Sequence, residues 1–186
     1  MTNRQYAQCV KAGVCNPSDE QRYQAKADPL EPVVAISWFD ANAFCTWLGA
    51  RLPTEAQWEK AARGGLTGKL YSWGDEEPIC DAGASNGANF RTDACGYYLE
   101  PVGSYAANGY GLYDMAGNVW EWTADWYDPN YYEVRENSNP FGPFESVTKV
   151  LRGGSWNYSK LALRVSDRFD LNPDLRYDYV GFRCAK

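Results

Sequence analysis

Three stretches near the start of the chain have the spacing of apolar and polar residues that is typical of short helices. The first begins after Thr2 with a capping-box pattern, and the third begins after Thr54 with the same pattern. Between them, Ser37 is a good N-cap for a helix over residues 38–48. Each stretch ends at glycine, which favours a helix stop. The pattern predicts two or three short helices.

Later in the chain, short apolar runs predict strands. The predicted strands are residues 118–122, 149–152 and 180–184. A further run at residues 32–36 predicts an extended segment. Polar stretches with proline at residues 16–31 and 128–145 predict surface loops. From residue 69 to residue 105 neither a helical nor a strand period persists, which predicts a long loop region.

Length and charge describe one soluble domain, residues 1–186. The net charge is −6 with a pI near 4.7, and no run of Lys or Arg occurs. Neither nucleic acid nor an anionic membrane surface is therefore an expected partner. No apolar stretch approaches the length of a membrane span, and residues 1–8 lack the apolar region of a signal peptide. We expect no membrane insertion.

The residue types exclude much familiar chemistry. The chain has no histidine, so it has no His-based general base, no Ser-His-Asp or Cys-His triad and no imidazole metal site. Its six cysteines never take a C-x-x-C spacing, which disfavours a zinc site and favours disulfides or buried thiols. Cys80 and Cys95 lie in the long loop region and are placed to pin it.

Residues 108–126 (NGYGLYDMAGNVWEWTADW) combine glycines with many large apolar side chains, which predicts a core segment. Asp114 and Glu121 are carboxylates among these aromatic residues, where a desolvated charge needs a partner. Together with backbone carbonyls of the turn between them, they offer the oxygen ligands that Ca²⁺ takes. The alternative is that both carboxylates accept backbone N–H bonds in a tight turn.

The C-terminal segment, residues 156–183, places apolar and aromatic residues in a frame of Asn, Asp and Arg without a helical or strand period. Rigid aromatic side chains with short polar neighbours are typical of a binding surface. The alternative is that half of these side chains simply pack under the loops.

Five motifs occur in order along the chain. They are RLPTEAQWE at residues 51–59, WG at 73–74, the segment 108–122, RGGSW at 152–156 and GFRC at 181–184. Together they closely resemble the formylglycine-generating enzyme (sulfatase-modifying factor) family, over residues 2–186. The resemblance implies an α+β, C-type lectin-like fold with small antiparallel sheets and much irregular loop. The family's usual first strands are missing or shortened here.

The resemblance also implies metal ligands and a disulfide. The family's calcium site corresponds to the side chains of Asp114 and Glu121 and the carbonyls of Gly117 and Val119. A second, weaker site would use Asn89, the carbonyl of Phe90 and an acid near Asp93. The family joins the positions of Cys45 and Cys184 by a disulfide. For the other cysteines, proximity alone suggests the pairs Cys9–Cys15 and Cys80–Cys95.

At the family's catalytic positions this chain departs from the pattern. The enzymes carry two cysteines shortly after the Gly-Gly-Ser turn, whose thiolates bind copper and oxidise a substrate cysteine. Tyr158 and Leu163 occupy those positions. Neither side chain is a soft copper ligand or forms a disulfide, so we expect no copper and no oxidase activity. Ser155 remains, but without a base it is expected to be a turn residue and not a nucleophile.

A sub-group of the family consists of variable proteins of diversity-generating retroelements. Their varied codons give Asn, Tyr, Ser, Asp, Phe, Leu or Ala, and never Lys, Glu, Gln, Met or Trp. The tail positions that fit this rule are Asn157, Tyr158, Ser159, Leu161, Ala162, Asp167, Phe169, Asp170, Leu171, Leu175, Tyr177, Asp178 and Tyr179. With Trp156, they form the predicted surface for a protein or other macromolecular ligand.

The sequence therefore predicts a non-catalytic ligand-binding protein with a variable C-terminal surface on a calcium-supported scaffold. One alternative is an oxidoreductase that acts on a sulfatase cysteine through a different thiol pair. Another is a sensor or scaffold module from a larger, kinase-like protein. We expect the cell surface or a secreted location if the disulfides form, and the cytoplasm otherwise.

Overall fold

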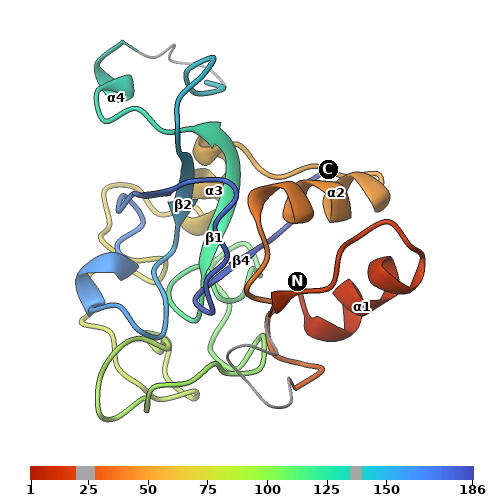
Figure 1. Cartoon of the computed structure of the whole chain (residues 1–186). Helices are drawn as coiled ribbons and strands as arrows, with labels where there is room; N and C mark the ends of the chain where they lie inside the picture. The colour runs from red at the N-terminus through yellow and green to blue at the C-terminus, as the bar shows by residue number, and fades with distance from the viewer. Residues whose placement is uncertain (20–27, 135–139) are drawn as a thin grey trace.

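The protein has short helices, one small sheet and long loops. The computed structural model describes residues 1–19, 28–134 and 140–186 (Figure 1). In chain order the elements are α1 (Asn3–Lys11), α2 (Trp38–Trp47), α3 (Glu55–Ala62), β1 (Trp120–Trp126), α4 (Tyr131–Val134), β2 (Lys149–Arg152), the 3-10 helix η2 (Lys160–Leu163), β3 (Phe169–Leu171) and β4 (Val180–Phe182). Residues 20–27 and 135–139, in the predicted surface loops, lie outside the described residues.

The first three helices begin where the caps predict. The side chains of Thr2, Ser37 and Thr54 each accept a hydrogen bond from the backbone N–H three residues later. The side chain of that later residue in turn accepts the N–H of the cap, which satisfies two donors that the helix leaves free. The capping-box prediction is therefore confirmed for α1 and α3, and the Ser37 N-cap of α2 is confirmed and proves to be a capping box as well.

The sheet is mixed, with strand order β3-β2-β1-β4. β2 pairs antiparallel with β1 and β3, whereas β4 pairs parallel with β1. The predicted antiparallel arrangement is thus wrong for β4, because the chain after β3 crosses back before it joins the far edge of the sheet. The run at residues 32–36, predicted as an extended segment, is not a named strand, and Ala35 within it has φ 53°; the apolar residues 33–36 are buried.

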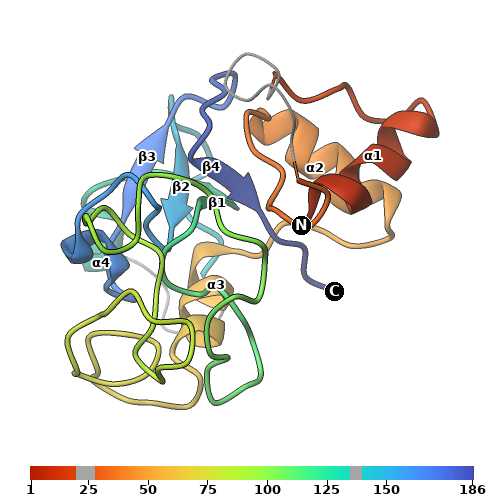
Figure 2. The same cartoon turned by 90° about the horizontal axis from the view of Figure 1, so that it is seen from below.

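The two faces of the sheet carry different side chains, because successive residues of a strand point to opposite faces. On one face Trp120, Trp122 and Leu151 join a core that includes Tyr6 of α1 and Phe44 of α2. Figure 2 shows these two helices side by side on one flank of the molecule. The opposite face packs against α3 and carries charged side chains. We call these the apolar face and the α3 face.

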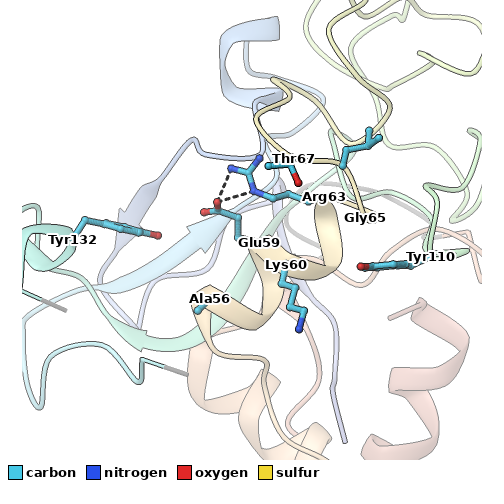
Figure 3. Close-up of a pocket in the computed structure, with 9 residues that line it drawn as sticks. Ala56, Glu59, Lys60, Arg63, Gly65, Thr67, Tyr110 and Tyr132 are labelled. Atoms are coloured by element: carbon cyan, nitrogen blue, oxygen red, sulfur yellow. Dashed lines mark hydrogen bonds and ion pairs between the residues drawn. The ribbon is translucent and has the colours of Figure 1, made fainter. Parts of the chain in front are cut away.

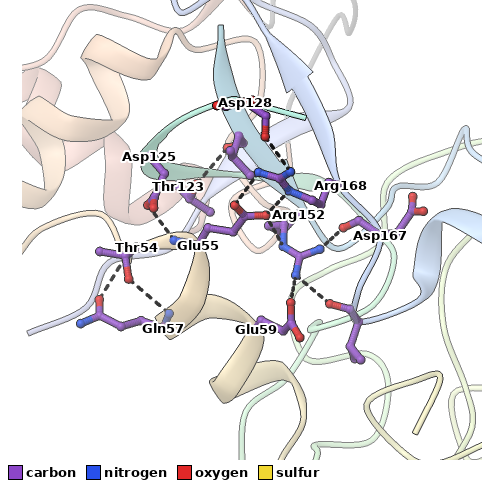
Figure 4. Close-up of polar contacts among 12 residues, drawn as sticks. Thr54, Glu55, Gln57, Glu59, Thr123, Asp125, Asp128, Arg152, Asp167 and Arg168 are labelled. Atoms are coloured by element: carbon purple, nitrogen blue, oxygen red, sulfur yellow. Dashed lines mark hydrogen bonds and ion pairs between the residues drawn. The ribbon is translucent and has the colours of Figure 1, made fainter. Parts of the chain in front are cut away.

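A cluster of ion pairs fills the α3 face. Arg152 of β2 is fully buried and forms ion pairs with Glu55 and Glu59 of α3. Glu55 also binds Arg168 through both of its oxygens, at 2.7 and 2.9 Å from the guanidinium. On the outer side of α3, Arg63 donates two hydrogen bonds to Glu59 (Figure 3). The cluster thus connects α3 to β2 and to the segment before β3 (Figure 4).

Disulfides tie the loops and the chain end to the core. The structure has the bonds Cys9–Cys15, Cys45–Cys184 and Cys80–Cys95. The second of these connects α2 to the residues after β4, across a separation of 139 residues. The predicted disulfides are confirmed, and the structure has no free cysteine. Within the described ranges, no helix is long and apolar enough to span a membrane.

Removal of the disulfide that closes the longest loop should destabilise the protein most. By loop-closure entropy, the Cys45→Ala, Cys184→Ala double variant should lose about 5 kcal/mol of unfolding free energy in urea melts. The matched Cys9→Ala, Cys15→Ala control closes a short loop and should lose only about 2 kcal/mol. Equal losses would show that the long loop is already restrained by other contacts.

Candidate functional site

The C-terminal segment, residues 156–183, is called the tail here. Four of its aromatic side chains form a cluster with Trp120 of β1 on the apolar face: Tyr158, Phe169, Tyr177 and Tyr179. Tyr158 lies 5.6 Å, between ring centroids, from Phe169 and from Tyr179. Tyr177 stacks on Tyr179 at 5.0 Å, and Phe169 stacks on Trp120 at 5.4 Å. Trp120 is 1% exposed and forms the floor, while the other four rings are partly exposed. These four rings are adjacent groups that a ligand could contact directly.

Backbone hydrogen bonds hold three separate parts of the tail together at the cluster. The N–H of Tyr158 donates to the Ser155 carbonyl in the turn after β2, and the Tyr158 carbonyl accepts from Arg91. Phe169 opens β3 opposite Leu151. The Tyr179 carbonyl accepts the N–H of Trp120. A surface assembled from segments that follow β2, open β3 and precede β4 has no single sequence period.

Five further predicted positions lie on the exposed side of the tail. Leu161 is 58% exposed and Leu175 is 41% exposed. Asn157, Ser159 and Asp178 are partly exposed. Partial burial raises the pKa of the Asp178 carboxyl above its ordinary value. These residues add short polar and apolar groups to the tail surface.

Other predicted positions do not reach the cluster. Ala162 and Leu171 are less than a tenth exposed and belong to the core. Trp156 packs against the buried group of Val34, Leu99 and Val119. The structure therefore separates these three residues, which pack, from the rings that a ligand can touch.

Two aspartates of the predicted surface also lie elsewhere. Asp167 forms an ion pair with Arg164, and its carbonyl accepts from Arg152 in the α3 cluster. Asp170 lies between Phe169 and Leu171 on β3, so its side chain points to the α3 face. Part of the tail thus supports the fold and does not face a ligand.

The positions of the family's catalytic cysteines are filled by packed side chains. Tyr158 belongs to the aromatic cluster, and Leu163 is fully buried beside Tyr71 and Phe90. Ser155 is fully buried and its hydroxyl donates to the Asn157 amide oxygen at 2.8 Å, so no base faces it. The Cys80–Cys95 disulfide packs in the same buried group as Leu163, but none of the six cysteines is a free thiol.

The carboxylates of the predicted calcium turn already have protein partners. Glu121 is 5% exposed and accepts from Arg183 at 2.6 and 2.8 Å and from the Trp58 indole at 2.6 Å. Asp114 accepts the Gly103 N–H at 2.8 Å, and burial raises the pKa of its carboxyl. The turn borders a cavity of about 440 Å³. In the part of the chain that is described, no group of three or more Asp, Glu, Cys or His residues could hold a metal.

The residues of the weaker calcium site are only partly brought together. Asn89 is fully buried against the turn at Gly117, where its carbonyl would lie 2.2 Å from an added Cβ. Gly117 has φ +85°, so both space and backbone conformation require glycine there. The Asn89 amide oxygen has no hydrogen-bond partner, and Phe90 is adjacent and buried. Asp93 is exposed and accepts from Tyr97 instead.

Sequence reasoning missed the basic partners of the buried acids. Arg183 stands in the GFRC motif, 62 residues from Glu121, and Arg168 lies 113 residues from Glu55. Pairs so distant in sequence have no local pattern. The only available signal was that a buried carboxylate needs a positive or hydrogen-bonding partner.

The fold and site together define a C-type lectin-like protein whose tail forms an aromatic surface. The chain belongs to the family described as the sulfatase-modifying factor enzyme 1-like domain, whose model matches residues 1–186. It is 44% identical over 167 residues to formylglycine-generating enzyme of Streptomyces coelicolor, covering 84% of this chain and 53% of that protein.

Two other similarities span most of the chain. The chain is 46% identical over 157 residues to the serine/threonine-protein kinase pkn1 of Chlamydia caviae, covering 83% of this chain and 24% of the kinase. The solved structure of Treponema denticola variable protein 1 matches with a TM-score of 0.77 and 26% identity, covering 98% of this chain and 80% of that one. The chain therefore spans about half the length of the enzyme and a quarter of the kinase.

Rings of the cluster should contribute to stability, whereas exposed tail residues should not. Tyr158→Ala should lower the unfolding free energy by about 2–3 kcal/mol, because it removes ring contacts to Trp120, Phe169 and Tyr179. Leu161→Ala, the control, should change it by less than about 0.5 kcal/mol. Urea melts of both variants check this, and a neutral Tyr158→Ala would mean that the ring is not packed.

Proposed function

We propose that the protein is a non-catalytic ligand-binding protein whose tail surface holds a protein or other macromolecular ligand. The observation that carries this proposal is the replacement of the family's two thiolates by a packed phenol and a fully buried leucine. A ring cluster with short polar neighbours offers large contact area at a low cost in side-chain entropy. The site thus has groups for contact and lacks a nucleophile or soft metal ligand.

The tail surface is further proposed to be the diversified region of a diversity-generating retroelement variable protein. Similarity to Treponema denticola variable protein 1 over 98% of the chain supports this assignment. The partly exposed positions Asn157, Ser159, Tyr177, Asp178 and Tyr179 all hold residue types that such diversification produces. A near-duplicate of the tail's DNA beside a reverse transcriptase gene would support this assignment. A genome that has neither the near-duplicate nor the reverse transcriptase gene would exclude it.

The second candidate is an oxidoreductase of the formylglycine-generating type, which the 44% identity to the Streptomyces coelicolor enzyme favours. The two functions predict opposite results. The protein should bind no stoichiometric copper(I) and should leave a cysteine-containing sulfatase peptide at its original mass. A mass shift to formylglycine would overturn the proposed binding function.

A diversified surface must accept substitution without unfolding. We expect Asn, Ser, Tyr or Asp at positions 159, 161, 175 and 178 to change the unfolding free energy by about 0.5 kcal/mol or less each. Asn at position 162 or 171 should cost more than about 2 kcal/mol, because each buries an amide in the core. Proteolytic stability of a displayed single-site library measures both sets. If substitutions at the exposed positions destabilise the protein as much as those at positions 162 and 171, the tail is not a variable surface.

Calcium is the proposed structural cofactor of the turn between Asp114 and Glu121. The oxygen donors there suit a hard cation, and both Asp114 and Asn118 adopt positive φ, of 56° and 65°, within this turn. Coordination by Glu121 requires that one of its oxygens be released from Arg183 or Trp58. Asp114 and the carbonyls of Gly117 and Val119 would be the other ligands.

Calcium should therefore raise the thermal midpoint. We expect 1 mM CaCl₂ to raise Tm by about 7 °C relative to EGTA, as a ligand at about 100 times its Kd stabilises by about 2.7 kcal/mol. Asp114→Gly, which suits the positive φ, should abolish the shift, whereas the exposed control Glu76→Gln should keep it. If all three proteins melt alike with and without calcium, the turn is held by hydrogen bonds alone.

The three disulfides support a cell-surface or secreted location as part of this proposal. Alkylation of the protein in cells, before and after reduction, distinguishes oxidised from free cysteines. Free cysteines in the native cell would favour the cytoplasm instead.

A further inference from the structure

A second cavity lies on the outer side of α3, away from the aromatic cluster. It has a volume of about 310 Å³ and is open to solvent. Its floor is the exposed face of α3 with Ala56, Lys60 and Arg63, and the rings of Tyr110 and Tyr132 stand at opposite ends (Figure 3). The tail residues Tyr158, Phe169, Tyr177 and Tyr179 do not line it. Neither the family's catalytic positions nor the proposed calcium turn accounts for this cavity.

Positive charge exceeds negative charge at the cavity. Glu59 lines it, but its carboxylate is shared between Arg63 and the buried Arg152. Glu55 behind it is shared between Arg152 and Arg168. These two carboxylates therefore face three guanidinium groups.

Lys60 adds a further positive charge. It is exposed and, among the described residues, has no carboxylate within ion-pair distance. The nearest other buried acid, Asp125, accepts the Glu55 N–H and lies near Lys149, and burial raises its pKa to about 6. The cavity is thus a locally positive site on a chain whose net charge is −6.

The remaining lining favours a ligand with a flat or apolar part. Tyr110 and Tyr132 present aromatic rings, and Leu66 adds an exposed apolar side chain. The hydroxyl of Thr67 is a hydrogen-bond donor at the end of α3 nearest Arg63 (Figure 3). The volume is at the lower end of the range for small-molecule sites, which is about 300–1,000 Å³.

We propose that this cavity binds an oxyanion, a carboxylate or phosphate, carried by a small organic group. Lys60 faces the oxyanion, Arg63 stays paired with Glu59, and the tyrosine rings contact the organic part. Of the charged residues that line the cavity, Lys60 and Arg63 are cationic and Glu59 is anionic, so an anion is the complementary ligand. This site is independent of the proposed tail surface, because it lies on the α3 side of the sheet.

The test uses inorganic phosphate and phenyl phosphate as probes, at constant ionic strength with NaCl as the balancing salt. Amide ¹H–¹⁵N shifts of residues 63–67 report binding. We expect saturable shifts with both probes, and phenyl phosphate should bind at least about threefold more tightly because of the rings.

Three variants distinguish binding of phenyl phosphate in this cavity from non-specific attraction of the anion to surface lysines. Lys60→Gln should weaken phenyl phosphate binding at least about fivefold, whereas Lys11→Gln, which removes another exposed helical lysine, on α1, should leave it unchanged. Ala56→Phe keeps every charge but fills the floor, so it should also weaken binding at least fivefold. Circular dichroism confirms that each variant is folded.

The proposal is overturned if the shifts grow linearly with either probe, or if Lys11→Gln weakens binding as much as Lys60→Gln. Unchanged binding in Ala56→Phe would likewise overturn it, since only a non-specific basic surface would then remain. None of these outcomes affects the tail surface, whose tests use other residues and other probes.

Discussion

The structure depends on the buried guanidinium of Arg152. It is fully inaccessible to solvent, and it binds two glutamates of α3 and two carbonyls of the tail, those of Val165 and Asp167. A charge buried in this way is tolerated only when its partners are in place, and loss of one partner costs about 3–5 kcal/mol. Helix, sheet and tail are therefore held in one arrangement by a single side chain. The tail surface is positioned by this cluster together with the backbone hydrogen bonds of Tyr158 and Tyr179.

The ionic contacts of Arg152 and Arg168 explain why a tail with little regular secondary structure has a defined conformation. Arg152 is followed directly by the glycine turn that leads to Tyr158, and Arg168 directly precedes Phe169. The ionic contacts lie on the α3 face, while the aromatic rings lie on the apolar face. Substitution of the rings therefore leaves the ionic contacts untouched, which is the property that a changeable binding surface requires.

Local patterns predicted the local parts of the structure well. Caps at Thr2, Ser37 and Thr54 located three helices, because a cap acts within four residues. By contrast, α4, η2 and β3 lie in stretches that mix polar and apolar residues without a helical or strand period, so the sequence did not predict them, whereas the equally short β2 and β4 were predicted from apolar runs. The direction of β4 and the partners of Glu121 are set by chain crossings and by residues far away in sequence. The family resemblance supplied the Cys45–Cys184 bond, which no spacing could have predicted.

The covalent link between α2 and the chain end has a consequence for how the tail can change. The segment between β2 and β4 is fixed at one end by Arg152 and at the other by the bond from Cys184 to Cys45. The segment is therefore fixed at both ends, so local unfolding in its middle does not release the C-terminus. The ends of this segment therefore stay at the same two points whichever side chains its exposed positions carry, while Ala162 and Leu171 are held in the core.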